Sequence, residues 1–257
     1  MTLHREKAAV ADALYEVRGL TKRYGDRLVL DHLDFEVLRG ECLVVLGRSG
    51  SGKSVTLRQL NGLERPDGGS VVFGGVDLCT LSERELFPLR KRIGMLFQSG
   101  ALFDSMDVFE NVAFPLRAHT KLSEDEVAAK VREVLEVVEL PGIEEKMPSE
   151  LSGGMRKRVA LARSLVLAPE VLLFDEPTTG LDPMTADSIA HTIATARDRA
   201  PTTTVVVTHD LRLTQTVASR LAFLDEGRFR FVGTWQEAQA SDDALLGHFL
   251  AGQREDA

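Results

Sequence analysis

The sequence best supports an α/β fold with a mainly parallel sheet. Apolar runs of strand length recur along the 257 residues, for example at 42–46 and 171–174. Segments of helical pattern separate these runs, and parallel neighbouring strands require crossovers of this kind. Strands that are apolar throughout also indicate a sheet covered on both faces. With 44% hydrophobic residues, the chain can bury a substantial core.

Strands and short helices alternate in the first hundred residues. Apolar residues alternate imperfectly between Leu28 and Val37, as in a half-buried strand. Pro66–Gly69 is a turn signal, and a Gly-rich loop at 47–52 separates a strand from a helix. In chain order we expect strand 28–37, strand 42–46, helix 53–63, strand 70–73, helix 82–92 and strand 93–97.

The segment from about 98 to 168 is rich in helical patterns and poor in strand patterns. Ser123 and Glu126 form a capping box at the start of one helix. A second helix is expected from Gly153 to about Ala168. We therefore expect this segment to form a separate helical lobe inserted into the main domain.

Strands return after the lobe, and a helical tail follows them. The elements expected here are strand 171–174, a helix after Pro183, and strands 203–207, 221–225 and 229–232. The domains expected are a flexible N-terminal lead at 1–13, a main domain at 14–233 and a C-terminal helical tail at 234–257.

Charge and composition argue against several classes of protein. A net charge of −8 disfavours a general affinity for nucleic acid, because phosphate binding needs a basic face. The apolar runs are too short for a membrane-spanning helix, which needs roughly 20 apolar residues. Asp12 interrupts the apolar patch of the N-terminus, which makes it a poor secretory signal. Cys42 and Cys79 show neither disulfide nor zinc-site spacing. We therefore expect a cytoplasmic protein.

A phosphate-binding loop separates the strand at 42–46 from the next helix. Its glycines let backbone N–H groups turn toward a β-phosphate, while Lys53 adds positive charge and the Ser54 hydroxyl can ligate Mg²⁺. The alternative is a Gly-rich turn with an incidental lysine, which the flanking strand and helix disfavour. The residues expected to bind the phosphates are Gly47, Arg48, Ser49, Gly50, Ser51, Gly52, Lys53 and Ser54.

An acidic strand end is the second chemical feature. Asp175 and Glu176 follow four apolar residues, so they should project from the carboxyl end of a strand, where open α/β sheets bind ligands. The sequence Leu151–Gly154 lies between the phosphate loop and these acids. This ordered set resembles the ATP-binding cassette (ABC) family, and the resemblance covers roughly residues 15–233.

The resemblance implies roles for several polar residues. It assigns Asp175 to Mg²⁺ through water and Glu176 to polarising the attacking water. It also implies that Gln98 reaches the metal, that His209 contacts the γ-phosphate and orients the water, and that Tyr24 stacks on adenine. ATP and Mg²⁺ are therefore the expected cofactors, and Mg²⁺-dependent ATP hydrolysis is the expected reaction.

The stretch Ser152, Gly153 and Gly154 should lie at a helix N-terminus, where N–H groups and the helix dipole favour an anion. By resemblance, this anion is the γ-phosphate held by the opposite subunit, and Asp182 lies at the same seam. The resemblance thus implies a homodimer with ATP between its subunits. Met155 stands where most cassettes carry glutamine, a change expected to tune the contact.

A narrower resemblance points to the ATPases of Mla-type phospholipid transporters and their MCE-associated relatives. It rests on residues 95–103, 111–120 and 147–155. It implies two partners, an integral-membrane permease and an MCE-domain lipid-binding protein, and a place at the cytoplasmic face of the inner membrane.

An apolar stretch in the lobe could contact the permease. Its residues could equally serve the core of the lobe, and some of them must do so. They are Ala101, Leu102, Phe103, Val108 and Phe109. The resemblance leaves open whether the C-terminal tail contacts the partner ATPase.

Three other functions stay open from the sequence. An ABC ATPase for amino acids, metals or drugs would use the same chemistry, because the cassette does not encode the cargo. A soluble cassette ATPase acting on nucleic acid or ribosomes is a second alternative. A P-loop kinase or GTPase outside the family is a third, which Leu151–Gly154 and His209 disfavour.

Overall fold

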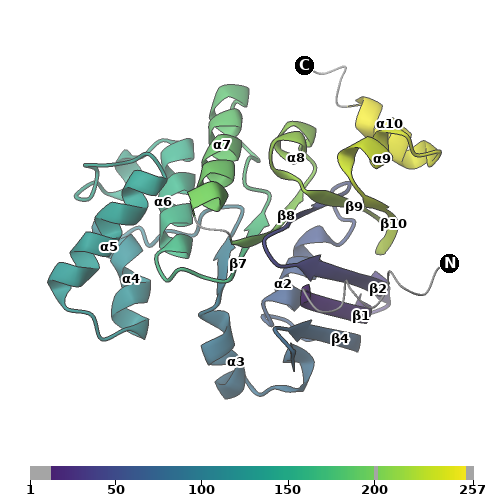
Figure 1. Ribbon diagram of the computed structural model, residues 1–257, viewed down its shortest axis with the longest axis horizontal. Helices are drawn as coiled ribbons and strands as arrows, with labels where there is room; N and C mark the ends of the chain where they lie inside the picture. Colours follow the sequence, from purple (N-terminus) through teal and green to yellow (C-terminus); the bar gives the residue numbers. More distant parts are fainter. Residues whose placement is uncertain (1–12, 200–201, 253–257) are drawn as a thin grey trace. The chain divides into compact units, whose positions relative to one another are not determined.

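The computed structural model describes residues 13–199 and 202–252 (Figure 1). These residues form two compact units. The first unit comprises residues 13–90 and 203–252, and the second comprises the described residues between 91 and 202. Each unit carries part of the predicted site.

Two of the predicted domains lie partly outside the described residues. The lead expected at 1–13 lies outside them except for Ala13, which begins the first strand. Residues 253–257 of the expected tail also lie outside. A lobe bounded at about 98 and 168 stays a prediction.

An antiparallel sheet forms one layer of the first unit. Its strand order is β2 (Arg27–Leu38), β1 (Ala13–Tyr24), β4 (Gly68–Phe73) and β5 (Val76–Asp77). The sequence pattern does not predict β1, because several register shifts against β2 break the alternation of its side chains between the two faces. Tyr15 of β1 is nevertheless fully buried, so the strand belongs to the core.

The mixed sheet contributes four strands to the first unit, in the order β10 (Arg228–Gly233), β9 (Arg220–Asp225), β3 (Cys42–Leu46) and β8 (Thr203–Thr208). β3 is parallel to both β8 and β9, whereas β10 is antiparallel to β9. All five residues of β3 are buried, as expected for a strand covered on both faces. The strands predicted in these four places are confirmed.

Short helices connect the strands of the first unit. α2 (Lys53–Leu60) begins directly after the Gly-rich loop, and α8 (Leu211–Val217) follows β8. α3 (Glu83–Arg90) ends this unit's N-terminal segment, after a single 3₁₀ turn at Leu78–Thr80. The helices predicted at 53–63 and 82–92 are thus present and slightly shorter than expected.

The C-terminal tail contains two helices, α9 (Trp235–Gln239) and α10 (Ala244–Gly252). Asp243 divides them, because its side chain accepts hydrogen bonds from two backbone N–H groups and caps α10. The rings of Phe249 in α10 and Phe223 in β9 lie 5.1 Å apart between centroids. The tail therefore packs against β9 within the first unit.

The second unit contains two parallel strands, β6 (Ile93–Leu96) and β7 (Val171–Asp175). Leu96 lies opposite Phe174 in the register of this pair. Because the two strands run in the same direction, the segments that follow them leave from the same edge. This edge carries the acidic residues predicted for the site.

Helices make up most of the second unit. They are α4 (Val108–His119), α5 (Glu124–Val137), α6 (Gly153–Leu165) and α7 (Pro183–Arg199), with a 3₁₀ turn at Pro148–Glu150. α4, α5 and α6 pack against one another (Figure 1). The capping box of Ser123 and Glu126 at the start of α5 is confirmed. No helix among the described residues has the length and apolar character needed to cross a membrane.

Asn111 organises the loop before α4. It is completely buried, its amide nitrogen donates to the carbonyls of Phe103 and Met106 at 3.1 and 2.9 Å, and its oxygen accepts from the N–H of Phe103 at 2.8 Å. Phe103 itself is 42% exposed. Val108 is fully buried, so it serves the core and not an exposed contact surface.

Candidate nucleotide-binding and hydrolysis site

The phosphate loop, residues 47–52, connects β3 to α2 in the first unit. A Cβ at Gly47 would clash with the carbonyl oxygen of Leu224. Gly50 and Gly52 have φ values of 78° and 110°, a region that glycine occupies without strain. The path of the loop therefore depends on glycine at these three positions.

Lys53 begins α2, and its side chain folds back across the loop. Its Nζ donates hydrogen bonds to the carbonyl oxygens of Gly47 at 2.8 Å and Arg48 at 3.0 Å, and only 6% of the residue is exposed. Ser54 follows in the first turn of the helix and is half-buried. A buried ammonium group beside backbone N–H groups at a helix N-terminus suits the binding of an anion.

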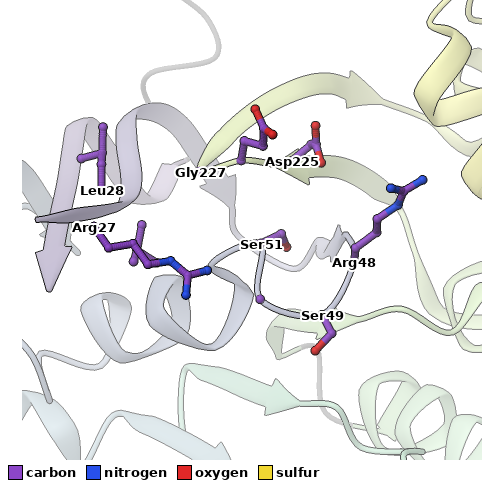
Figure 2. A pocket seen from close by; sticks show the side chains of 10 residues that line it. Arg27, Leu28, Arg48, Ser49, Ser51, Asp225 and Gly227 are labelled. Carbon is purple, nitrogen blue, oxygen red and sulfur yellow. The ribbon is translucent and has the colours of Figure 1, made fainter.

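A cavity of ≈ 330 Å³ lies beside the phosphate loop (Figure 2). The loop contributes Arg48 to Ser51, and β2 and the β9–β10 turn contribute the remaining walls. Figure 2 shows the guanidinium of Arg27 directed toward the loop, and its Nη2 lies 3.9 Å from where a Cβ at Gly50 would be. Asp225 and Glu226 also line this cavity. Arg48 belongs to the predicted phosphate loop, whereas no motif in the sequence points to Arg27.

Tyr24 ends β1 and pairs with Arg27 across a tight hairpin. Its ring is 45% exposed, and its hydroxyl donates a 2.5 Å hydrogen bond to Oε1 of Glu64. Partial burial and the bond to this carboxylate raise the pKa of Tyr24 to about 12, so the hydroxyl stays protonated at neutral pH. An exposed ring in the hairpin that reaches the loop is suited to stacking on a base, the role predicted for it.

His209 follows β8 in the way that the phosphate loop follows β3. Leu46 and Thr208 are paired at the ends of these parallel strands, so Gly47 and His209 leave the sheet at the same edge. His209 is exposed. The first unit therefore brings the phosphate loop and the predicted γ-phosphate contact together.

Asp175 and Gln98 lie at the carboxyl edge of the strands in the second unit. Asp175 is the last residue of β7, and Gln98 lies two residues beyond the end of β6. The Asp175 side chain is half-buried, whereas Gln98 is exposed. The parallel pairing of the two strands therefore places these side chains at one edge, as the sequence predicts.

The oxygen atoms of Ser54, Gln98 and Asp175 fit the chemistry of Mg²⁺. A hydroxyl, an amide and a carboxylate are hard oxygen ligands of the kind this ion prefers. In the part of the chain that the structure describes, no three His, Cys, Asp or Glu side chains form a metal-binding group. This finding is compatible with Mg²⁺, which takes one or two carboxylates together with phosphate oxygens and water.

Glu176 has an unusual backbone conformation. Its φ is 47°, in the left-handed region, where a residue with a side chain costs on the order of 1–3 kcal/mol. The residue is 9% exposed, and its Oε2 accepts a hydrogen bond from the hydroxyl of Thr179 at 3.1 Å. The N–H of Thr179 also donates to the Glu176 carbonyl at 3.2 Å. The predicted catalytic glutamate thus stands in a strained turn.

Lys157 holds the turn that carries Glu176, although no motif in the sequence points to it. It lies in α6, and its Nζ donates to the carbonyl oxygens of Glu176 at 3.3 Å, Pro177 at 2.6 Å and Thr179 at 3.0 Å. It is 7% exposed, and burial lowers its pKa against the opposing influence of the Glu176 charge. Lys157 lies three residues after Gly154, and both residues are on the buried face of α6.

Ser152, Gly153 and Gly154 lie at the N-terminus of α6, as predicted. Ser152 is the N-cap, and its Oγ accepts a hydrogen bond from the N–H of Met155 at 3.2 Å. A Cβ at Gly154 would clash with the side chain of Thr185, whereas one at Gly153 would approach Leu181 at 3.3 Å. Glycine at position 154 therefore lets α6 pack closely against the start of α7.

Asp182 caps α7 in this structure. Its Oδ1 accepts from the N–H of Thr185 at 3.0 Å, and its Oδ2 accepts from the Thr185 hydroxyl at 2.6 Å. These two bonds, the one to the hydroxyl first, lower the pKa of the Asp182 carboxyl. Its predicted place at a dimer seam stays a prediction.

Comparison with known proteins identifies the family. Residues 30–179 match the model of the ABC transporter family. The chain is 41% identical over 240 residues to the intermembrane phospholipid transport system ATP-binding protein MlaF of Haemophilus influenzae, covering 93% of this chain and 91% of that one. It is 42% identical over 239 residues to the probable ribonucleotide transport ATP-binding protein mkl of Mycobacterium tuberculosis, covering 93% and 67%.

Solved structures agree with this assignment. CbiO1 from Clostridium perfringens, part of the ABC transporter complex cbiONQ, has a TM-score of 0.82 at 30% identity and covers 95% of this chain and 97% of that one. The dimeric cassette MJ0796 bound to ADP and Pi has a TM-score of 0.78 at 30% identity, covering 86% and 98%. The fold, the family model and the near-complete alignments agree, and the protein therefore belongs to the ABC transporter family as one of its ATP-hydrolysing ATP-binding proteins.

Proposed function

We propose that two copies of this chain bind ATP and Mg²⁺ between them and drive a permease that moves phospholipid between membranes. In this proposal the chain acts at the cytoplasmic face of the inner membrane, and an MCE-domain protein receives or delivers the lipid. The near-complete overlap with MlaF carries the proposal: the two sequences are 41% identical over almost their full lengths.

The proposed chemistry assigns each cluster of residues a task. The N–H groups of the phosphate loop and the Lys53 ammonium hold the β- and γ-phosphates, and Mg²⁺ supplies charge neutralisation there when bound. Glu176 accepts a proton from the attacking water, and His209 orients that water. Tyr24 stacks on adenine. A general base of this kind contributes roughly 10²–10⁴ in rate.

Exposed residues at the start of α6 and after Asp182 support the proposed dimer. Ser152 is exposed at a helix N-terminus, where an anion is stabilised by N–H groups and the helix dipole. Met184, two residues after Asp182, is 84% exposed and is available for a contact across the proposed seam. In our proposal the partner's γ-phosphate lies at Ser152, and hydrolysis removes this contact so that the two copies separate.

An exposed aromatic surface of the second unit supports a permease contact. Phe97, Phe103 and Phe114 are 39, 42 and 43% exposed, and the rings of the last two lie 5.1 Å apart between centroids. The guanidinium of Arg163 lies 5.7 Å from the Phe103 ring. Aromatic residues with arginine are typical of interface centres. We propose that this surface binds a cytoplasmic segment of the permease.

Ribonucleotide transport is the second candidate cargo, because the mkl protein carries that name at 42% identity. Identity alone does not separate the two cargoes. Coverage favours the phospholipid reading, since this chain spans 91% of MlaF and 67% of mkl. The cassette chemistry does not encode the cargo in either case.

The proposal is tested by mass spectrometry of the proteins and lipids that copurify with the tagged chain from gently solubilised native membranes. We expect a permease, an MCE-domain protein and bound phospholipid. A permease that copurifies with a soluble solute-binding protein and no phospholipid would overturn the lipid cargo and leave the ATPase intact.

Two matched variants test the permease surface in the same experiment. Phe103→Asp should lose the permease from the copurified material while ATP binding is retained. Val232→Asp changes a side chain of the first unit that is 45% exposed and should keep the permease. Equal recovery of the permease with both variants would contradict the proposed surface.

A further inference from the structure

The turn that carries Glu176 is fastened to α6 by one side chain. The Lys157 ammonium donates three hydrogen bonds to carbonyl oxygens of this turn, at 2.6 to 3.3 Å. An ammonium group has three N–H donors, so the three carbonyls match its full capacity. The bonds to Glu176 and Pro177 are buried and the bond to Thr179 is partly buried, and hydrogen bonds from a charged donor are strong.

The same turn needs support from outside. Glu176 occupies the left-handed region at a φ of 47°, a conformation that persists only where the surroundings impose it. Thr179 links the two restraints, because its hydroxyl holds the Glu176 carboxylate while its carbonyl accepts from Lys157. Lys157 therefore restrains both the backbone of Glu176 and the residue that orients its side chain.

The position of Lys157 along α6 connects the Glu176 turn to the helix end that meets ATP in the proposed function. It lies in the second turn of the helix whose N-cap is Ser152. In the proposed function this N-terminus meets the γ-phosphate of the ATP bound to the partner. A helix is a stiff element, so its N-terminus and Lys157 move together.

We propose that Lys157 is a positioning residue for ATP hydrolysis. Its hydrogen bonds tie the Glu176 turn to α6, the helix whose N-terminus meets the γ-phosphate of the ATP bound to the partner. The position of this helix therefore also sets the position of the Glu176 carboxylate. The inference rests on the proposed role of Glu176 as the base. It adds that this role depends on a hydrogen-bonded link within the same subunit.

The test compares Lys157→Met, Glu176→Gln and the double variant in the complex purified through the tagged chain. Methionine keeps a similar length and removes all three donors. We expect Lys157→Met to lower kcat by about 10- to 100-fold, the size expected when a catalytic group is displaced by about 1 Å. The KM for ATP and the ATP affinity should stay within about twofold.

The double variant separates a positioning role from an independent one. If Lys157 acts through Glu176, Lys157→Met should lower kcat little further in the Glu176→Gln background. Losses that multiply would overturn the inference, as would a normal kcat in the single variant. Normal turnover of Glu176→Gln would instead refute the proposed base, a result that is distinguishable from both.

A control and a second variant keep the test decisive. Lys130→Met makes the same chemical change on α5, where the side chain is exposed, and should leave kcat unchanged. If Lys157→Met does not yield folded protein, Lys157→Gln is judged by the same split between kcat and KM, because it removes the charge and keeps two N–H donors. A Lys157→Gln variant in which ATP affinity falls and kcat is preserved would contradict the positioning role.

Discussion

Each unit of the molecule contains a buried lysine whose ammonium binds backbone carbonyls, and the two loops they serve differ. Lys53 donates to a carbonyl of the phosphate loop, in which glycines take the positive φ values at no steric cost. Lys157 donates to carbonyls of a turn in which Glu176, a residue that has a Cβ, takes the positive φ. The phosphate loop can thus hold its own path, whereas the Glu176 turn depends on a helix outside it.

The largest expected effect concerns the group that Lys157 supports. Glu176→Gln should lower kcat by about 10²–10⁴-fold, because the amide cannot accept the proton of the attacking water. ATP affinity should be retained, and the dimer should persist longer in the presence of ATP. Steady-state hydrolysis and light scattering with ATP measure the two effects. Hydrolysis close to that of the wild-type complex would remove Glu176 from its proposed role.

Lys53→Ala sharpens the comparison between the two lysines. Loss of the charged donor should weaken ATP binding by about 10- to 150-fold, since hydrogen bonds to charged groups contribute about 1.5–3 kcal/mol. Lys157→Met should leave the same affinity almost unchanged. Titration with a fluorescent ATP analogue measures both variants side by side. Equal losses of affinity would mean that the two lysines do not have separate tasks.

Tyr24 provides a test of how the first unit holds the base. Tyr24→Ala should weaken ATP binding by about 5- to 150-fold, from a stacking contribution of about 1–3 kcal/mol per base. Tyr24→Phe keeps the ring and loses only the hydrogen bond to Glu64, so its affinity should stay near that of the wild type. If the phenylalanine variant binds as weakly as the alanine variant, the hydroxyl and not the ring is what matters.

The smallest effect is expected at the start of α6. Ser152→Ala removes the N-cap and should lower the free energy of unfolding by about 1 kcal/mol. Ser123→Ala removes the cap of α5 and should cost a similar amount. Only the Ser152 variant should also weaken ATP-dependent dimerisation, as measured by denaturant titration and light scattering. Identical dimerisation of both variants would count against an anion at Ser152.

Much of the fold is predictable from local patterns. Buried strands such as 42–46 and 171–174 are apolar throughout, and the capping box at Ser123 marks the start of a helix. β1 is not predictable in this way, because register shifts break its alternation. The exposure of the apolar stretch is also only partly predictable, since Phe103 is exposed and Val108 fully buried within one short segment.

Site residues that form a motif of consecutive residues are predictable from the sequence. Site residues that meet through contacts between distant segments are less so. The phosphate loop, Asp175 and Glu176 are each local in sequence. The bonds of Lys157 join residues about twenty positions apart, so no spacing rule identifies them. The positive φ of Glu176 likewise follows from tertiary contacts and not from any preference of glutamate.

Reconstituted lipid transfer tests the central claim most directly. The complex purified through this chain would be placed in vesicles that contain a fluorescent phosphatidylethanolamine, with acceptor vesicles and ATP added. We predict ATP-dependent movement of the fluorescent lipid with the wild-type chain and none with Glu176→Gln. A complex that hydrolyses ATP at a normal rate and moves no lipid would contradict the account.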